Sequence, residues 1–349
     1  MNLEFWKGKR VFITGHTGFK GIWLVNILNH LGANVYGYSK NDQFKKNFRK
    51  FCYLKKGSNY FGDILNKKNL FEKLNKVKPD IVIHLAAQSL VKKSFLNPEE
   101  TININIIGTL NLLECCRKIK TIKSIILATS DKCYENNNNK KYFKEEDKIG
   151  GDDPYSASKA SCEIIINSYI KSFFFDNKKG IASVRAGNVI GGADWAKNRI
   201  IPDCARSIMN KKNLYLRSPN SIRPWQHVLD VLNGYLILAK KLYEVKNKNK
   251  YNGNYNFGPS EKKYFNVKKV VKLFFKSIKL NKKIIFSKQN FGKEKNIILL
   301  SSKKSLKMLK WKQTINFEKT IKLTAMWYYN FINNKKNEIE RQIILSKLF

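Results

Sequence analysis

The chain has 349 residues, enough for about two lobes around a sizeable core. Its formal net charge is +41, from 67 Lys and Arg against 26 Asp and Glu. The lysines are spread over almost every segment, without an Arg-rich arm or a basic and aromatic motif. We therefore interpret the charge as a residue bias on a solvated surface and expect no nucleic-acid partner.

The sequence predicts neither a membrane segment nor a metal site. The first residues lack the apolar stretch of a signal peptide, and no later run approaches the about 18 apolar residues of a membrane helix. The cysteines form no CxxC pair and no Cys/His spacing that suits zinc. They are Cys52, Cys115, Cys116, Cys133, Cys162 and Cys204. We expect a cytoplasmic protein with reduced thiols.

From Arg10 onward, short apolar runs alternate with longer amphipathic stretches. The runs RVFITG, NVYGYS, DIVIHLAA and SIILATS are typical of strands, whereas WLVNILNHLG and NIIGTLNLLECCRKI have helical spacing. This alternation predicts an α/β fold with a Rossmann-type, doubly wound parallel sheet. The ligand sites of such folds lie at the carboxyl ends of the strands.

The regular alternation weakens after Gly187. We expect residues 1–187 to form a dinucleotide-binding Rossmann domain, to which the chain returns near residues 226–258. Residues 188–225 and 259–349 are expected to form a smaller α/β lobe that binds the substrate. The low-complexity stretch ENNNNKKYFKEED, from Glu135 to Asp147, predicts an exposed loop.

A glycine-rich stretch, VFITGHTGFKG, follows the first predicted strand and places Gly15, Gly18 and Gly21 before a helical pattern. Glycines there permit a tight turn, so that a pyrophosphate can approach the amides of a helix N-terminus. The GxxGxxG spacing is the form seen in short-chain dehydrogenase/reductases. It predicts a dinucleotide site, with Thr17 and Phe19 as further contacts in the loop.

Two later stretches also fit a dinucleotide. In FGDI, the Asp63 carboxylate is placed to accept from an adenine amino group, with Ile64 beside it. The stretch HLAAQS ends a predicted strand with residues that let a cofactor lie close: Leu85, Ala86 and Ala87.

The second predicted strand leaves the choice between NAD and NADP open. It ends at Ser39 and Lys40, without the acidic residue that is expected about 20 positions after the glycines to bind a ribose hydroxyl. We take NAD as the expected cofactor and keep NADP as the alternative.

Chemistry-bearing residues gather after the strand SIILATS and in the stretch DPYSASKA. Tyr155 and Lys159 are four residues apart, and therefore share one helical face. An ammonium beside a phenol lowers the pKa of the phenol, which would make Tyr155 a general base near neutral pH. Ser130 is a natural hydrogen-bond partner for the same substrate hydroxyl, and Asp131 and Lys132 follow it. This set suits hydride removal from a carbinol carbon to a nicotinamide.

With these motifs, the chain resembles the extended short-chain dehydrogenase/reductases that modify nucleotide sugars, and more narrowly the CDP-glucose 4,6-dehydratase family. The narrow resemblance rests on FWKGKRVFITGHTGFKGIWL, TSDKCYEN, GGDDPYSASKA, VRAGNVIGGADWAKNRIIPD, RPWQHVLD and MLKWKQTINFEKTIKLTAMWYYN, and spans nearly the whole chain. It implies NAD-dependent dehydration of CDP-D-glucose to CDP-4-dehydro-6-deoxy-D-glucose for deoxysugar and surface polysaccharide synthesis. It also implies a homodimer through the helix of Tyr155 and its neighbour.

The resemblance implies a role for each catalytic candidate. Tyr155 would take the proton of the sugar 4-hydroxyl while NAD accepts hydride from C4. Asp131 would protonate the departing 6-hydroxyl before the hydride returns to C6. Lys132 stands where the dTDP-sugar dehydratases carry a second acid that acts as base at C5. It would serve as a neutral base or as a charged stabiliser of the enolate, or would merely neutralise Asp131.

The resemblance also implies a substrate-binding set, namely Gln88, Ser130, Asn188, Arg199, Arg217 and Arg223. Asn188 follows the apolar run IASVRA and is expected to contact the sugar or its diphosphate. Arg217 and Arg223 can pair with a diphosphate in a bidentate manner. We interpret His227, in the motif RPWQHV, as a structural hydrogen-bonding residue.

Two alternatives are kept. A 4-epimerase, or a dehydratase of another nucleotide sugar, would use the same fold, although an epimerase needs no acid and base such as Asp131 and Lys132. A non-catalytic protein that senses NAD or binds nucleic acid would fit the +41 charge, although it has no need of the Tyr155 and Lys159 pair. Serines in LLSSKKSLKML, where relatives carry an aspartate, leave room for altered substrate contacts.

Overall fold

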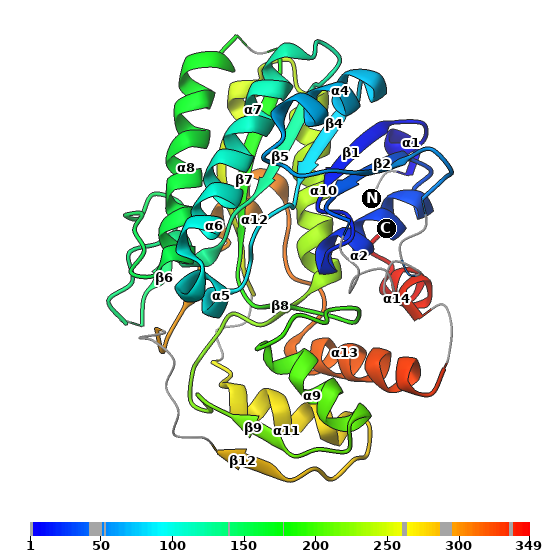
Figure 1. Cartoon of the computed structure of the whole chain (residues 1–349), viewed down its shortest axis with the longest axis vertical. Coiled ribbons are helices and arrows are strands. Elements are labelled where there is room, and N and C mark those ends of the chain that lie inside the picture. Colours follow the sequence, from blue (N-terminus) through cyan, green and yellow to red (C-terminus); the bar gives the residue numbers. More distant parts are fainter. Residues whose placement is uncertain are drawn as a thin grey trace.

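The computed structural model describes residues 3–41, 51, 54–138, 140–176, 178–259, 264–286, 295–334 and 338–349. Its centre is a parallel seven-stranded sheet with the order β11-β7-β5-β4-β1-β2-β3 (Figure 1). The strands are β1 (Arg10–Thr14), β2 (Asn34–Ser39), β3 (Asn59–Phe61), β4 (Ile81–His84), β5 (Ser124–Ala128), β7 (Gly180–Ala186) and β11 (Gly253–Phe257). The predicted doubly wound Rossmann-type fold is confirmed.

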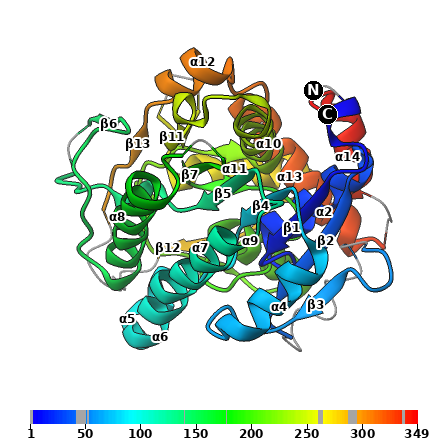
Figure 2. The same ribbon diagram turned by 90° about the horizontal axis from the view of Figure 1, so that it is seen from above.

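Helices cover both faces of this sheet (Figure 2). One face carries α4 (Lys67–Val77), α7 (Gly108–Lys118) and α8 (Pro154–Phe173), and the other carries α2 (Phe19–His30) and α10 (Val228–Glu244). Side chains of a strand point alternately to the two faces. In β1, Val11 and Ile13 therefore join the core under α2 and α10, whereas Phe12 joins the core under α4 and α7. The continuous apolar runs of the sequence result from burial on both faces.

A smaller lobe lies below the sheet in Figure 1. It contains α9 (Ile200–Met209), β9 (Leu214–Leu216), α11 (Val267–Ser277), β12 (Ile284–Phe286) and α13 (Phe317–Ile332). Strands β9 and β12 pair in parallel, and α11 packs against α13. Between these segments, α10 and β11 return to the large sheet. The smaller lobe is therefore discontinuous in sequence.

The remaining described elements are short. They are α1 (Leu3–Trp6), α5 (Val91–Leu96), α6 (Pro98–Ile102), β6 (Tyr142–Phe143), β8 (Val189–Ile190), β10 (Gln226–His227), β13 (Leu299–Leu300), α12 (Lys303–Leu309) and α14 (Glu338–Ser346). A π-helical turn spans Asn103–Ile107, and 3-10 turns span Asp131–Cys133 and Lys248–Lys250. Strand β8 pairs with β10, and β6 with β13.

The stretch 135–147, predicted as an exposed loop, is partly ordered against the core. Its strand β6 pairs with β13, and the buried ring of Phe143 stacks on Tyr134 with centroids 4.9 Å apart. Asn136 is buried and donates to the carbonyl of Ile297 over 2.9 Å. The prediction of a wholly exposed loop is wrong. Phe143 is an aromatic residue within this mainly polar stretch, and its burial holds the stretch against the core. Asn139 lies outside the described residues.

Three sequence expectations concern absences. Among the described helices, none combines the length and apolarity that crossing a membrane requires. The described part of the chain contains no group of three or more His, Cys, Asp or Glu placed to hold a metal ion. Cys115, Cys116, Cys133, Cys162 and Cys204 are buried free thiols, and Cys52 lies outside the described residues.

Candidate active site

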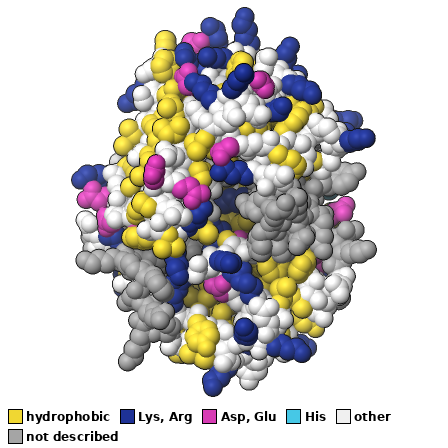
Figure 3. All heavy atoms as spheres, viewed as in Figure 1, with side chains coloured by type: hydrophobic (Ala, Val, Ile, Leu, Met, Phe, Trp, Pro, Cys, Tyr) yellow, Lys and Arg dark blue, Asp and Glu magenta, His cyan; other side chains and the backbone are white. Residues whose placement is uncertain are grey.

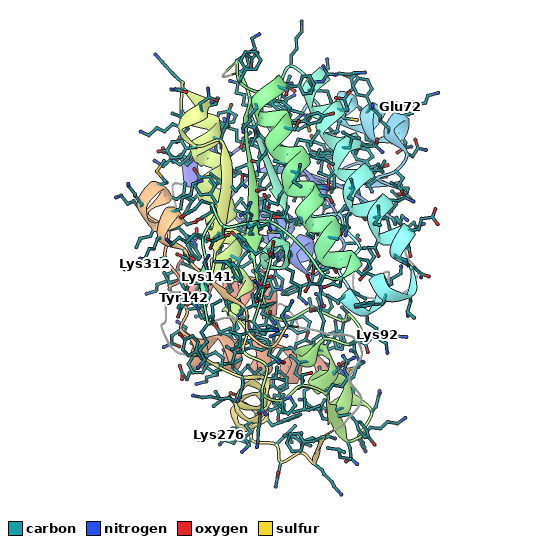
Figure 4. All side chains as sticks on the ribbon, turned by 90° about the vertical axis from the view of Figure 1, so that its left-hand side faces the viewer. Glu72, Lys92, Lys141, Tyr142, Lys276 and Lys312 are labelled. Carbon is teal, nitrogen blue, oxygen red and sulfur yellow. The ribbon has the colours of Figure 1, made fainter. Side chains whose placement is uncertain are left out.

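A cleft of about 1400 Å³ opens between the sheet and the smaller lobe, at the carboxyl ends of β1, β4, β5 and β7. Figure 3 shows the molecule hollowed at this level, with Lys and Arg side chains in the hollow. Figure 4 shows Lys92, another lining residue, between the helices of the sheet domain and the lobe. The cleft therefore lies where a doubly wound sheet binds its ligands.

Most of the predicted site residues line this cleft. They are Gly15, Gly18, Phe19, Gly21, Leu85, Ala87, Ser130, Asp131, Lys132, Tyr155, Lys159, Asn188, Arg199, Arg217 and Arg223. Residues that are more than 100 positions apart in the sequence thus meet at one end of the sheet. Thr17, Asp63, Ile64, Ala86 and Gln88 are absent from its lining.

The glycine loop after β1 has a shape that side chains would obstruct. Gly15 has φ +74°, and a Cβ there would lie 2.6 Å from the backbone nitrogen of Ala86. A Cβ on Gly21 would lie 2.6 Å from the Cα of His16. The loop is consequently pressed against the end of β4, with the N-terminus of α2 open to the cleft. This cradle fits a pyrophosphate bound by backbone amides.

The predicted cofactor-binding residues that do not line the cleft interact with other residues of the protein. Thr17 donates its hydroxyl to Ser39 over 3.0 Å, and Ile64 is buried in the core. The Asp63 carboxylate pairs with Lys40 at 2.8 Å and accepts from the backbone of Leu65, which together hold its pKa below the usual value. These residues stabilise the rim beside the glycine loop.

Gln88 supports the loop after β4 and is not on the cleft wall. Its amide donates to the Leu90 carbonyl over 3.1 Å and to the Thr101 hydroxyl over 2.8 Å, and its oxygen accepts from the Leu90 nitrogen. Its backbone nitrogen donates to Asn105, whose amide reaches Ser158 on α8 over 2.9 Å. Asn105, which the sequence reasoning missed, thus ties this loop to the helix of Tyr155.

Helix α8 begins immediately before Tyr155. The Asp153 carboxylate caps it by accepting from the nitrogen of Ser156 over 2.9 Å, and Pro154 occupies the first helical position. Tyr155 and Lys159 are both buried at the cleft. The Lys159 ammonium donates to the carbonyl of Ala128, at the end of β5, over 3.4 Å. The helix and the strand end are thereby joined beside the site.

The end of β5 turns into a 3-10 helix that Ser130 caps. The Ser130 hydroxyl accepts from the nitrogen of Lys132 over 3.2 Å and donates to Asp131 Oδ1 over 3.1 Å. Ser130 also acts on the Tyr155 phenol, whose pKa it lowers against the effect of burial. Asp131 is buried, and its Oδ2 has no hydrogen-bond partner among the described residues. The capping serine therefore also holds the buried Asp131 carboxyl.

Burial controls the electrostatics of these groups. It raises the pKa of Asp131, against the cations of Lys132, Arg223 and Lys20 and the hydrogen bond from Ser130. It raises the pKa of Tyr155 to about 12, although Ser130 and Arg199 act in the opposite direction. The prediction that neighbouring groups lower the pKa of Tyr155 is therefore wrong. Desolvation of the phenolate outweighs the opposite effects of Ser130 and Arg199.

A buried ion pair behind the site was not predicted. Glu163, one helical turn after Lys159, pairs with Arg185 of β7 at 2.8 Å, and neither side chain is exposed. Glu163 also accepts from the hydroxyls of Thr129 and Ser183. Because Thr129 precedes Ser130, this pair holds the strand end in place. The sequence feature that could have indicated this buried pair is the arginine within the apolar run IASVRA.

Lys20 is a second residue that the sequence reasoning missed. It lines the cleft from the glycine loop and donates to the Tyr235 hydroxyl over 3.3 Å. Burial and the cations of Arg199 and Lys159 lower the pKa of Lys20 to about 8, and Asp131 acts against this shift. The signal was a lysine in GHTGFKG, at the start of an otherwise apolar helix. Lys20 adds a cation where a pyrophosphate would bind.

The substrate-binding candidates come from the segments that lead into the lobe. Arg199 pairs with Asp194 at 3.1 Å and donates to the Ser89 hydroxyl over 3.0 Å, so that it links the two walls of the cleft. Arg223 is buried, donates to the carbonyl of Asn296 over 3.0 Å, and faces Asp131 electrostatically. Asn188 and Arg217 line the cleft as well. His227 caps α10 by accepting from the nitrogen of Leu229.

The fold and the site define a class: a Rossmann-type protein with the Ser, Tyr and Lys arrangement of the short-chain dehydrogenase/reductases. Comparison with known families narrows it. Residues 12–324 match the model of the family described as GDP-mannose 4,6 dehydratase, and the chain belongs to this family. The resemblance to nucleotide-sugar dehydratases and epimerases is thereby confirmed.

Individual relatives agree with this assignment. The chain is 37% identical over 338 residues to a CDP-glucose 4,6-dehydratase of Salmonella typhimurium, covering 95% of this chain and 94% of that protein. An epimerase structure from Methanothermobacter thermautotrophicus superposes with a TM-score of 0.81 at 21% identity, covering 95% and 96%. A dTDP-glucose 4,6-dehydratase of Bacillus anthracis in complex with NAD superposes with 0.76 at 21%, covering 94% and 99%. These superpositions show that the fold is shared.

Proposed function

We propose that the protein is an NAD-dependent hydro-lyase that converts CDP-D-glucose to CDP-4-dehydro-6-deoxy-D-glucose and water. The observation that carries this proposal is that Tyr155, Ser130 and Asp131 line one cleft. An epimerase needs a base at O4 but no acid at O6, so a buried carboxyl beside the phenol favours dehydration. The identity of 37% to a protein named CDP-glucose 4,6-dehydratase supports the choice of CDP-glucose.

The protein's own groups divide the proton transfers. Tyr155 takes the proton of the 4-hydroxyl, and Asp131 gives a proton to the departing 6-hydroxyl. Lys132 lies next to Asp131 on the cleft wall, where it takes the C5 proton or stabilises the enolate. Bound NAD would supply the hydride acceptor for C4 and the hydride donor for C6.

The cofactor proposal rests on the glycine loop. The backbone around Gly15, Gly18 and Gly21 leaves room for a pyrophosphate at the N-terminus of α2, and Lys20 contributes a cation there. At the adenosine side, Lys40 forms an ion pair with Asp63 at 2.8 Å. A lysine engaged in this way is less available to a 2′-phosphate, which favours NAD over NADP.

The substrate proposal rests on the arginines of the lobe. Arg199, Arg217 and Arg223 line the cleft, and guanidinium groups bind diphosphates in bidentate fashion. Asn188, in the same wall, would contact the sugar or the diphosphate. The buried thiols in the described part of the chain suit a reducing compartment, and we keep a cytoplasmic location as part of the proposal.

We also propose a homodimer through the outer faces of α7 and α8. Apolar side chains are exposed on and beside these helices: Ile102, Ile107, Ile164 and Phe173. Such a patch is typical of an interface. Sedimentation should give a dimer that Ile164→Lys dissociates, whereas Ile344→Lys, at another exposed position on α14, leaves it intact. A monomeric wild type would refute this part of the proposal.

The activity is tested with purified protein, NAD and the glucose derivatives of CDP, dTDP, UDP and GDP. The proposal predicts that CDP-glucose gives a product with the alkaline absorbance of a 4-keto sugar, and that Asp131→Asn abolishes it. Product from another nucleotide would move the proposal to that base. Absence of product from all of them, with duplex DNA bound at physiological salt, would favour the nucleic-acid alternative.

A further inference from the structure

One buried ion pair holds both ends of the turn that carries the acid and base candidates. This turn, residues 130–133, follows Thr129 and precedes Tyr134. At its start, the Thr129 hydroxyl donates to Glu163. At its end, the Tyr134 hydroxyl accepts from Arg185 Nη1 over 2.7 Å, and Arg185 Nη2 donates to Glu163 over 2.8 Å. The two ends of the turn are therefore connected through Glu163 and Arg185.

The geometry of this connection is fixed by Arg185. A guanidinium is planar, and its Nη atoms donate in set directions. Arg185 belongs to β7, which pairs with β5, so its own place does not depend on the turn. The side chains of Arg185 and Glu163 have no exposed surface, and Tyr134 is 2% exposed. Water therefore does not compete for these hydrogen bonds, and the low local dielectric strengthens them.

Tyr134 has no part in the chemistry itself. It does not line the cleft, and its ring stacks on Phe143 with centroids 4.9 Å apart. Its phenol oxygen accepts from Arg185, and its hydrogen is donated to Asn256 Oδ1 over 2.7 Å. Burial holds the pKa of Tyr134 well above its usual value, so that the phenol stays neutral. Any effect of Tyr134 on the reaction must therefore pass through the turn.

We propose that Tyr134 is a positioning residue, which places Asp131 and Lys132 for the elimination of water. This inference rests on the proposed function. Tyr134 is two residues after Lys132, and Cys133 between them is buried. Without the bond from Arg185, this end of the turn can move, together with the groups that act at O6 and C5. A displacement of about 1 Å in a reacting group is enough to lower a rate by about 100-fold.

The oxidation at C4 depends on other groups. Tyr155 and Lys159 belong to α8 rather than to the turn. Ser130 is the first residue of the turn, at the end that Thr129 holds. Loss of the Tyr134 hydroxyl should therefore leave hydride transfer from C4 intact, while it slows the steps at C5 and C6. A general loss of stability would not separate the two halves of the reaction in this way.

Tyr134→Phe tests this role, because it removes the hydroxyl and keeps the ring that stacks on Phe143. In a single turnover with NAD and CDP-glucose, the absorbance of the reduced nicotinamide should appear at the wild-type rate. It should then decay at least about tenfold more slowly than in wild type, and kcat should fall. The KM for CDP-glucose and the affinity for NAD should not change.

Two controls separate position from stability. Tyr169→Phe, on α8 away from the cleft, removes a hydroxyl that donates to Glu114 over 2.9 Å, and it should leave both rates unchanged. Phe143→Leu removes the stacked ring but keeps the bond from Arg185 to Tyr134. It should lower the resistance to urea, because it shrinks a buried side chain, without slowing the decay.

The result expected is a decay that is slow only in Tyr134→Phe. A decay at the wild-type rate in this variant, or an equal slowing of formation and decay, would overturn the positioning role alone. A wild-type protein that dehydrates none of the nucleotide sugars would overturn the proposed function and this inference with it.

Discussion

Gly187 lies so close to Asp131 that a Cβ at this position would overlap the carboxylate oxygen Oδ2. Gly187 directly follows β7, and Asp131 follows β5, so the two neighbouring strand ends are pressed together at the cleft. This contact keeps water from one side of the carboxyl. It is one source of the burial that raises the pKa of Asp131.

Gly187→Ala should therefore displace the Asp131 carboxyl. We expect kcat for dehydration to fall by about 100-fold, the lower range for loss of a general acid. Gly8→Ala is the control, because no atom lies near a Cβ added there, although the positive φ of Gly8 strains the backbone of this variant. It should cost about 1 kcal/mol of stability and no activity. Wild-type turnover by Gly187→Ala would show that the position of the carboxyl is not critical.

Lys132 can be tested for its two proposed roles with two variants. Lys132→Met removes both the base and the charge, and should abolish incorporation of solvent deuterium at C5. Lys132→Arg keeps the charge but cannot act as a base near neutral pH. If Lys132→Arg retains turnover, the role of Lys132 is to stabilise the enolate. If this variant loses turnover, the role of Lys132 is that of the base. Lys148→Met, at an exposed lysine, should behave as wild type. Unchanged elimination in Lys132→Met would remove Lys132 from the mechanism.

The buried Glu163 and Arg185 pair predicts a stability effect. Glu163→Gln leaves the Arg185 guanidinium buried without its counter-charge, which should cost about 3–5 kcal/mol in the free energy of unfolding. Glu244→Gln breaks a partly exposed pair with Lys240 on α10 and should cost less than about 1 kcal/mol. Urea unfolding of the three proteins measures both values. Equal losses in the two variants would contradict the structural role of the buried pair.

Lys20 predicts a dependence of stability on pH. Its pKa in the folded protein is lowered to about 8, from an ordinary value of 10.5. Below about pH 8 both states hold the proton, and the folded state carries the full cost of the desolvated ammonium. Between these two pKa values only the unfolded state holds it, so stability rises with pH. Lys20→Met should thus be more stable than wild type at neutral pH, by a difference that shrinks above about pH 8.

The same Lys20→Met variant should bind NAD more weakly, because it lacks a cation beside the glycine loop. Lys68→Met, at an exposed position of α4, should change neither quantity. Urea unfolding over a pH series and NAD titration are the two measurements. If Lys20→Met is no more stable than wild type at neutral pH, burial of the Lys20 ammonium does not destabilise the folded protein.

The periodic features of this protein could be predicted from the sequence, because they repeat. Continuous apolar runs at β1, β4 and β5, which alternate with helical patterns, are enough to predict a parallel sheet and the end at which ligands bind. Helical geometry in the same way places Tyr155 and Lys159, which are four residues apart, on one face of a helix. Local pattern carries this information without any knowledge of packing.

What the sequence could not reveal depends on burial and on partners distant in the chain. Gln88 looks available for a substrate until its amide is found bound to Leu90 and Thr101. The pKa direction of Tyr155 is set by the desolvation of its phenol, which no spacing rule includes. The pair of Glu163 and Arg185 forms only when α8 packs on β7.

In the proposed reaction, one active site oxidises C4 and reduces C6 of the same CDP-glucose molecule. Incubation of the purified protein with NAD and CDP-glucose that carries deuterium at C4 tests this most directly. We expect a 4-keto product in which the deuterium has moved to C6 of the same sugar. Deuterium retained at C4 of an epimerised sugar, or no conversion of CDP-glucose, would contradict it.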